Sequence, residues 1–228
     1  MSVSMHLILL LLLLPLLATA EEVRVRGLRA PAEILMDKWG VPHIYGKSRE
    51  DAFFAQGFNA ARERLFQIDL WRRRGLGRMA EQMGPAYVEQ DRATRLFLYR
   101  GSIEKEWATY GKDARAIATA FVSGINAYID WVSAHPEQMP VEFSVTGYQP
   151  EKWDPADVVR IRSHGLTRNL TSEVARARTV CRAGAEKGLL HDHARVGLQP
   201  AWESKIPDGL DACLPEDVLR VFTLATQA

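Results

Sequence analysis

The fold is decided by residues 48–77, which read SREDAFFAQGFNAARERLFQIDLWRRRGLG. Ser48 with Asp51 three residues later is a capping pattern typical of a helix start. Apolar residues then recur at spacings of four and three, which predicts one apolar stripe along a long helix. This stripe consists of Phe54, Phe58, Ala61, Leu65 and Ile68. Gly75 and Gly77 are expected to end the helix, since glycine is a poor helix former.

On the amino-terminal side of this helix the pattern changes to that of short strands. Residues 23–26 alternate between apolar and charged side chains, and residues 32–36 and 41–45 read as two further strands. Residues 39–40, Trp-Gly, lie between the last two strands, so a hairpin is the natural connection. Pro42 restricts the third strand to a sheet edge or to its own first position.

The carboxyl-terminal side is mostly helical in pattern. Helical periodicity covers residues 86–100 and 102–131. Residues 141–148, which follow two prolines, read as extended. A new helix is expected at Asp154-Pro155, with proline at the first helical position. The sequence therefore predicts an α+β chain that is mostly α-helical and begins with a β-hairpin.

The first twenty residues have the pattern of a secretory signal peptide. An apolar run at residues 7–17 is interrupted only by Pro15 and is followed by Ala-Thr-Ala at residues 18–20. The run is shorter than the about 20 apolar residues that a membrane span needs, and the small-x-small site favours cleavage. We expect a periplasmic or secreted protein whose mature chain begins at Glu21, without a stable membrane anchor. An uncleaved anchor is the alternative, because no Lys or Arg precedes the run.

The overall charge argues against nucleic acid as a partner. Lys and Arg together number 29 and Asp and Glu 28, which leaves a net charge of +1. So small an excess implies no general attraction to nucleic acid or to anionic membranes. The basic run at residues 72–74, with Arg78, is interleaved with acidic residues and carries no RNA or DNA motif. We interpret it as a solvated or subunit-facing side of the long helix.

The two cysteines leave two possibilities open. Outside the cytoplasm thiols tend to pair, and a bond between Cys181 and Cys213 would close a loop of about 30 residues, worth roughly 3 kcal/mol in the chain-entropy model. Two free, buried thiols are the alternative. The run His191-Asp192-His193 offers two imidazoles and a carboxylate to a metal ion, but with no third ligand nearby a surface loop is the preferred interpretation.

The sequence contains no familiar nucleophile motif. Neither a Gly-x-Ser-x-Gly elbow nor an HExxH pattern occurs. The single Gly-Ser pair, Gly101-Ser102, lies between two helical patterns and is interpreted as a helix boundary. From the residues alone, the sequence predicts only an exported, mostly helical chain with an amino-terminal β-element.

Residues 37–81 resemble the opening of the α-subunits of the penicillin acylase family. The resemblance is carried, in the family's order and spacing, by residues 37–45 (DKWGVPHIY), 51–57 (DAFFAQG), 64–70 (RLFQIDL), 72–73 (RR) and 77–81 (GRMAE). It continues more thinly to about Arg178. The resemblance implies that the complete enzyme is a four-layer αββα N-terminal-nucleophile hydrolase.

In this family the precursor cuts itself, and the freed β-subunit begins with a serine or a related nucleophile. Its hydroxyl attacks the substrate amide, and its own α-amino group serves as the base. Oxyanion donors also come from the β-subunit. The nucleophile is typically followed by Asn, and this sequence contains no Ser-Asn pair. The resemblance therefore implies that this chain carries no catalytic residue.

The family's α-subunit supplies part of the acyl pocket and one ligand of a structural calcium ion, and both map to residues 164–173 (HGLTRNLTSE). Glu173 matches the calcium ligand, and carboxylate oxygens suit this hard cation. Arg168 matches an arginine at the pocket edge that helps to orient substrate. Gly165 and Asn169 stand where the phenylacetyl-specific members have Met and Phe, which puts penicillin G as the preferred substrate in doubt. Two ordinary solvated helix charges are the alternative for Glu173 and Arg168.

The resemblance divides the chain into a signal peptide (1–20), an α-subunit-like domain (21–180) and a poorly matched carboxyl-terminal segment (181–228), which we interpret as a linker or spacer. It implies the α-part of an exported acylase that hydrolyses linear amides of penicillin, acyl-homoserine-lactone or lipopeptide type. The implied partners are the β-subunit of the same precursor and a small acyl-amide substrate, and calcium, shared with that subunit, is the implied cofactor.

A different class of function stays open beside this one. The chain could be a non-catalytic truncated remnant, or an exported helical binding protein on the same scaffold. In the family architecture much of the apolar α-surface packs against the β-subunit. We therefore expect the stripe of the long helix to be left bare in this chain alone, where it would promote association.

Overall fold

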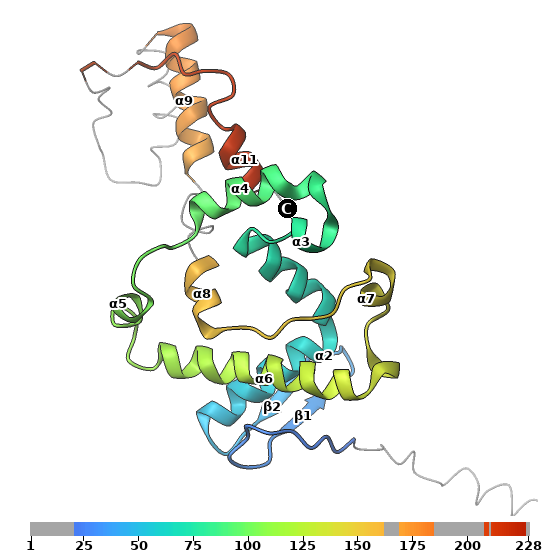
Figure 1. Cartoon of the computed structure of the whole chain (residues 1–228). Helices are drawn as coiled ribbons and strands as arrows, with labels where there is room; N and C mark the ends of the chain where they lie inside the picture. The colour runs from blue at the N-terminus through green and yellow to red at the C-terminus, as the bar shows by residue number, and fades with distance from the viewer. Residues whose placement is uncertain (1–20, 162–168, 185–207, 210, 227–228) are drawn as a thin grey trace, which may run out of the picture.

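The computed structural model describes residues 21–161, 169–184, 208–209 and 211–226. Within these ranges the chain is mostly helical, with one two-stranded antiparallel sheet near its beginning (Figure 1). The elements are β1 (Glu33–Met36), β2 (Pro42–Tyr45), α2 (Arg49–Leu76), α3 (Ala80–Met83), η1 (Pro85–Tyr87), α4 (Val88–Phe97), α5 (Ile103–Trp107), α6 (Ala114–Ala134), η2 (Pro136–Gln138), α7 (Val141–Thr146), α8 (Pro155–Ile161), α9 (Leu170–Ala183) and α11 (Arg220–Thr226).

The predicted hairpin is confirmed. β1 pairs with β2 in an antiparallel register that places Ile34 opposite Ile44. In the turn, the Asp37 side chain accepts hydrogen bonds from the backbone N–H groups of Trp39 at 2.8 Å and Val41 at 2.9 Å. One carboxylate therefore satisfies two backbone donors and fixes the turn.

The strand predicted at residues 23–26 is wrong. This segment has no ladder partner among the described residues, yet Val23 and Val25 are partly buried against the core while their charged neighbours are exposed. Any extended segment that covers a core with one face shows the same period of two. The alternation of apolar and charged residues at 23–26 therefore indicates burial of one face and not pairing in a sheet.

The long helix begins and ends as predicted. The Ser48 hydroxyl accepts a hydrogen bond from the Asp51 backbone N–H at 3.0 Å and donates one to the Asp51 carboxylate at 2.7 Å. At the other end Gly77 takes a left-handed conformation, φ 66°, which costs glycine little. Non-helical angles at Arg64 place a kink within α2.

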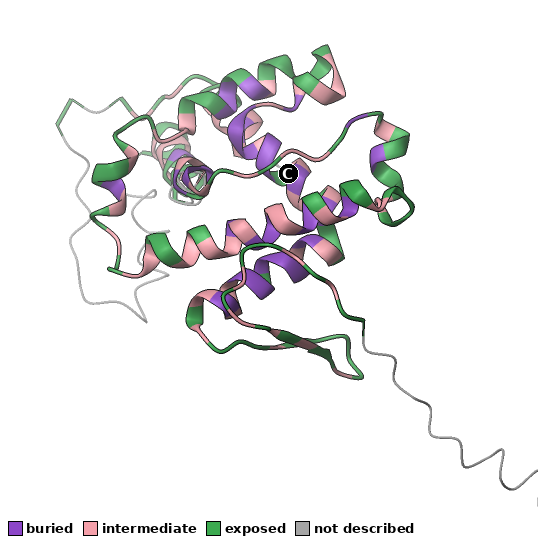
Figure 2. Ribbon diagram, turned by 60° about the horizontal axis from the view of Figure 1, so that its bottom comes forward, coloured by how far each residue is buried: buried purple, intermediate pink, exposed green. Residues whose placement is uncertain are grey.

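The core forms where α2 crosses α6, and Figure 2 shows buried residues on the facing sides of the two helices. Phe58 of α2 meets Tyr128 of α6 edge to face, with ring centroids 5.3 Å apart. The apolar stripe of α2 lies in this crossing, with four members buried and Ile68 partly buried. The expectation that the stripe is bare in this chain is therefore wrong, because α6 covers it.

Two further predictions of secondary structure need correction. Residues 102–131 form two helices, α5 and α6, since a turn around the exposed Gly111 separates them. Residues 141–148, predicted as extended, contain helix α7. Their alternating apolar residues resemble a strand, but Pro140 occupies the N-cap position of a short helix that Gly147 ends at φ 76°. The predicted helix start at Pro155 is confirmed by α8, and residues 86–100 contain α4.

The cysteines are joined. A disulfide links Cys181 at the end of α9 to Cys213, which decides between the two possibilities that the sequence left open. No helix in the described ranges is both long and apolar enough to cross a membrane.

Candidate functional site

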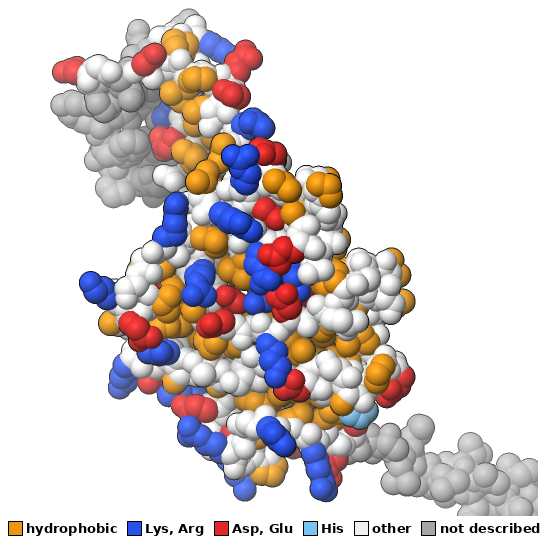
Figure 3. Space-filling view, viewed as in Figure 1, with side chains coloured by type: hydrophobic (Ala, Val, Ile, Leu, Met, Phe, Trp, Pro, Cys, Tyr) orange, Lys and Arg blue, Asp and Glu red, His pale blue; other side chains and the backbone are white. Residues whose placement is uncertain are grey.

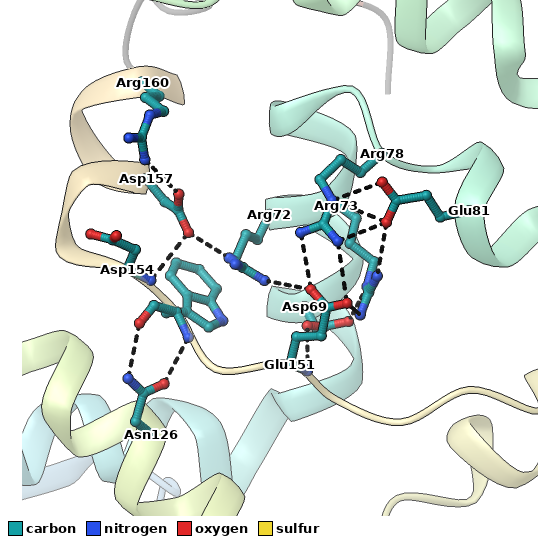
Figure 4. A network of polar contacts seen from close by, with 11 residues as sticks. Asp69, Arg72, Arg73, Arg78, Glu81, Asn126, Glu151, Asp154, Asp157 and Arg160 are labelled. Carbon is teal, nitrogen blue, oxygen red and sulfur yellow. Dashed lines mark hydrogen bonds and ion pairs between the residues drawn. The ribbon is translucent and has the colours of Figure 1, made fainter.

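Two ion pairs stand at the centre of the polar side chains between α2 and α8 (Figure 4). The Arg72 Nε donates to Asp157 at 2.7 Å, and both side chains are about 95% buried. One residue along α2, the Arg73 Nε donates to Asp69 at 2.7 Å, and neither side chain is exposed. A buried charge must be paired in this way, because an unpaired one costs several kcal/mol.

Glu151, in the segment between α7 and α8, joins these pairs to the surface. Its carboxylate lies 3.0 Å from a guanidinium nitrogen of Arg78, 3.3 Å from Arg73 and 3.6 Å from Arg72. Arg78 also pairs with Glu81 at 2.7 Å. Acidic and basic side chains gather accordingly in the middle of the face shown in Figure 3.

The interpretation of the basic run as a solvated or subunit-facing side of the helix is therefore wrong for Arg72 and Arg73. Their side chains point into the chain, where carboxylates that are distant in sequence neutralise them. Arg74 is partly buried, and burial lowers the pKa of its guanidinium. The cluster holds arginines and carboxylates in balance, as a structural network requires.

Aromatic residues complete the same layer. The Arg73 guanidinium lies over the Tyr148 ring at 5.0 Å, and that of Arg72 lies over Trp153 at 5.7 Å. Burial, aided by the charge of Asp69, raises the pKa of Tyr148 to about 12. The Asn126 side chain of α6 bonds both the N–H and the C=O of Trp153, at 2.8 and 2.9 Å. The segment leading into α8 is thus fixed to both long helices.

The structure describes two of the four residues expected in the substrate and calcium sites. Asn169 is exposed at the start of α9, where its carbonyl accepts from the Glu173 N–H at 3.0 Å. The Glu173 carboxylate pairs with Arg176, one turn along, at 2.7 Å and is about half exposed. Gly165 and Arg168 lie outside the described residues, as do His191 and His193.

No group of three or more possible metal ligands occurs in the part of the chain that the structure describes. Glu173 is therefore not surrounded there by other His, Cys, Asp or Glu ligands. Ser102 caps α5, where its hydroxyl accepts from the Lys105 N–H at 3.3 Å. This confirms the interpretation of Gly101-Ser102 as a helix boundary, and it gives the hydroxyl a structural partner.

A family model, penicillin amidase, matches residues 31–207. The chain belongs to the penicillin amidase family. It is 36% identical over 131 residues to the penicillin acylase 2 proenzyme of Pseudomonas sp. (strain SE83), a match that covers 58% of this chain and 16% of that protein. It is 30% identical over 166 residues to the acyl-homoserine lactone acylase QuiP of Pseudomonas aeruginosa, a match that covers 72% of this chain and 19% of the relative.

A similar solved structure comes from the same family. A thermostable penicillin G acylase from Alcaligenes faecalis matches with a TM-score of 0.58 and 28% identity, over 78% of this chain and 97% of the solved chain. The chain thus spans less than a fifth of the two relatives in sequence, but it matches nearly all of one solved penicillin G acylase chain.

Sequence reasoning missed the carboxylates that hold this part of the penicillin amidase fold together. Asp69 and Arg73 stand four residues apart on one helix, and that spacing could have indicated the pair. Asp157 lies 85 residues from Arg72 and Glu151 lies 73 from Arg78, so no local pattern connects them.

The network should make the chain sensitive to acid. A hydrogen bond from Arg78 lowers the pKa of the Glu81 carboxyl group. For Glu151, burial alone would raise the pKa. The hydrogen bond from Arg78 and the charges of the three arginines, Arg73, Arg78 and Arg72, outweigh burial and bring the pKa below its usual 4.5. A carboxyl group whose pKa is lower in the folded state stabilises the fold at any pH above its pKa in the unfolded state. This stabilisation is lost as the pH falls through its pKa in the folded state. We expect the melting temperature to fall below pH 4.5.

The variant Glu151→Gln tests this expectation by thermal melts between pH 7 and pH 3. It should melt lower than the wild-type chain at pH 7 and lose less on acidification, so that the two curves converge at low pH. Glu142→Gln, at an exposed position on α7, is the control and should follow the wild-type curve. Parallel curves for Glu151→Gln and wild type would show that the carboxylate does not contribute through its charge.

Proposed function

We propose that this chain is the α-part of an exported acylase precursor that hydrolyses linear amides. The observation that carries the proposal is the family match over residues 31–207. A difference in length between two relatives supports the proposal. The penicillin acylase 2 proenzyme is about six times longer than the stretch that matches this chain, whereas 97% of one solved penicillin G acylase chain is matched. A precursor divided into chains explains both findings.

In this proposal the chemistry comes from the downstream part of the precursor. An N-terminal serine there attacks the acyl carbon, its α-amino group takes the hydroxyl proton, and the amine leaves. Together the two parts form the four-layer αββα architecture. The role of this chain is to supply residues 164–169, which follow α8 in the sequence, to the acyl pocket. Helix α8 itself is held to α2 by the ion pair between Arg72 and Asp157.

The substrate is a small acyl amide of penicillin, acyl-homoserine-lactone or lipopeptide type. Relatives named for the first two classes support this range. The small Gly165 and the polar Asn169 at expected pocket positions favour an acyl group other than phenylacetyl. Arg168 would orient the substrate as a cation at the pocket edge.

We propose Glu173 as one ligand of a structural calcium ion shared with the downstream part. Its carboxylate is about half exposed, so a partner can approach it, and carboxylate oxygens suit calcium. The other ligands would come from the partner, since none surrounds Glu173 among the described residues. The isolated chain should therefore bind calcium weakly.

The experiment that tests the proposal joins this chain to the coding sequence downstream of Ala228. The joined precursor should cut itself and then hydrolyse members of a panel of acyl amides, while the purified 228-residue chain should show no turnover. Turnover by the chain alone would contradict the proposal. An in-frame stop after Ala228 would instead support the truncated remnant or the exported binding protein, which the α2–α6 core of this chain also allows.

Two variants of the joined precursor distinguish the proposed calcium role of Glu173 from the proposed substrate role of Arg168. Glu173→Gln should slow maturation in a way that a chelator reproduces, while matured enzyme keeps its rate. Arg168→Ala should spare maturation and raise KM. Glu89→Gln is the matched control, because Glu89 and Arg92 form a similar exposed pair three residues apart on α4. Normal, chelator-insensitive maturation of Glu173→Gln would remove the calcium assignment.

A further inference from the structure

Helix α9, which carries Asn169 and Glu173, stands apart from the body formed by α2 and α6 and lies beyond α4 (Figure 1). Its carboxyl-terminal end is fastened by the disulfide from Cys181 to Cys213. Three residues earlier in sequence, the Arg178 guanidinium donates to the carbonyl of Glu216 at 2.7 Å. Two links therefore connect α9 to the short segment that follows Cys213.

That segment is itself attached to the body. It ends in α11, which packs on α4. Phe222 of α11 meets Phe97 of α4 at a centroid distance of 6.1 Å, and Ala225 is 2% exposed. A continuous path of contacts thus runs from α9 through the disulfide and α11 to α4.

We propose that residues 211–226 act as a strap that sets the position of α9 on the body, and with it the positions of Asn169 and Glu173. The consequence for substrate and calcium rests on the proposed function, whereas the mechanical role of the strap does not. Cys213 and α11 lie beyond residues 31–207, which the family model matches.

The disulfide is the part of the strap that solution conditions can change. Both cysteines are exposed, so a reductant can reach them. A dithiol reductant cleaves the S–S bond to two thiols and is itself oxidised to a disulfide. The other bond from α9 to the strap, Arg178 to Glu216, is an exposed hydrogen bond that water can replace at little cost. Opening the disulfide should thus loosen α9 from the strap while α6 keeps its packing.

Hydrogen exchange on the purified chain tests the strap without any assay of activity. In the variant Cys181→Ser/Cys213→Ser, amides of residues 170–183 should exchange about tenfold faster or more, as expected when local opening becomes easier. Amides of residues 114–134 in α6 should be unchanged. Reduction of the wild-type chain should give the same pattern.

A second variant tests the carboxyl-terminal end of the strap, where α11 packs on α4. Phe222→Ala keeps the disulfide but weakens the packing of α11 against α4. It should therefore also speed amide hydrogen exchange in α9. Val221→Ala, at an exposed position on the same helix, is the matched control and should leave exchange unchanged. Unchanged α9 exchange in the cysteine variant, or equal acceleration in α6, would overturn the proposal.

The functional arm uses the joined, matured enzyme. Reduction should raise KM for the acyl amide about threefold or more with kcat preserved, because the strap orients binding groups and not the nucleophile. An unchanged KM despite faster α9 exchange would overturn the link to substrate. If the joined enzyme hydrolyses no amide at all, the proposed function fails, and the exchange experiment still decides the mechanical role of the strap.

Discussion

Replacing Arg73 with methionine should lower the free energy of unfolding by about 3–5 kcal/mol, because the change leaves the Asp69 carboxylate buried without its partner. Neither side chain is exposed to solvent, and the Arg73 Nε donates to Asp69 at 2.7 Å. The substitution also removes the contact with Glu151 at 3.3 Å. For a chain of this length the loss corresponds to a melting temperature lower by about 10 °C.

Two further variants distinguish the charge from the packing. Arg92→Met breaks an exposed pair with Glu89 and should change stability by less than about 0.5 kcal/mol. The double variant Arg73→Met/Asp69→Leu removes both buried charges and should recover much of the loss. An Arg73→Met chain that melts within about 2 °C of wild type would show that water or rearrangement pairs Asp69 in its absence.

The parts of the penicillin amidase fold that could be predicted from the sequence are those whose cause is local. Ser48 and Asp51 bond each other at the start of α2, and Gly77 ends it within one turn. In the hairpin, the Asp37 carboxylate satisfies the backbone of its own turn. Such features involve residues within five positions of one another, so the sequence pattern contains them.

The errors arose where the cause lies far along the chain. An extended segment at residues 23–26 becomes a strand only if another strand lies beside it, and none of the described residues supplies one. The stripe of α2 is covered by α6, about 65 positions later, and no periodicity within α2 can indicate what covers its apolar face. The same holds for Asp157, which neutralises Arg72 across 85 residues.

The candidate site was harder to predict than the fold. Arg168, Asn169, Gly165 and Glu173 were assigned only by resemblance, because a single arginine or glutamate on a helix has no local signature of binding. Where the structure describes these positions, they lie at the start of an exposed helix. In the proposed function, the other groups of both sites come from the downstream part of the precursor. A site of the kind proposed, with groups from two subunits, leaves no complete pattern in the sequence of one of them.

Replacing Gly124 with alanine should destabilise the chain by about 1–3 kcal/mol, although alanine is the better helix former by about 1 kcal/mol. Gly124 lies buried in α6 where it crosses α2. An added Cβ would overlap the backbone carbonyl of Phe54 and come within 2.7 Å of the backbone nitrogen of Phe58. Backbone atoms cannot turn aside as a side chain can, so the two helices must separate and the core between them must loosen.

The reciprocal position strengthens the test. A Cβ at Gly57 of α2 would overlap the backbone carbonyl of Phe121 in α6, so Gly57→Ala should cause a similar loss. Gly111→Ala is the matched control, because nothing lies within 4 Å of a Cβ there, and it should melt at or slightly above the wild-type temperature. The melting temperatures of the three variants decide the matter. A Gly124→Ala chain more stable than wild type would mean that the crossing can widen without cost, and that helix propensity outweighs close approach at this position.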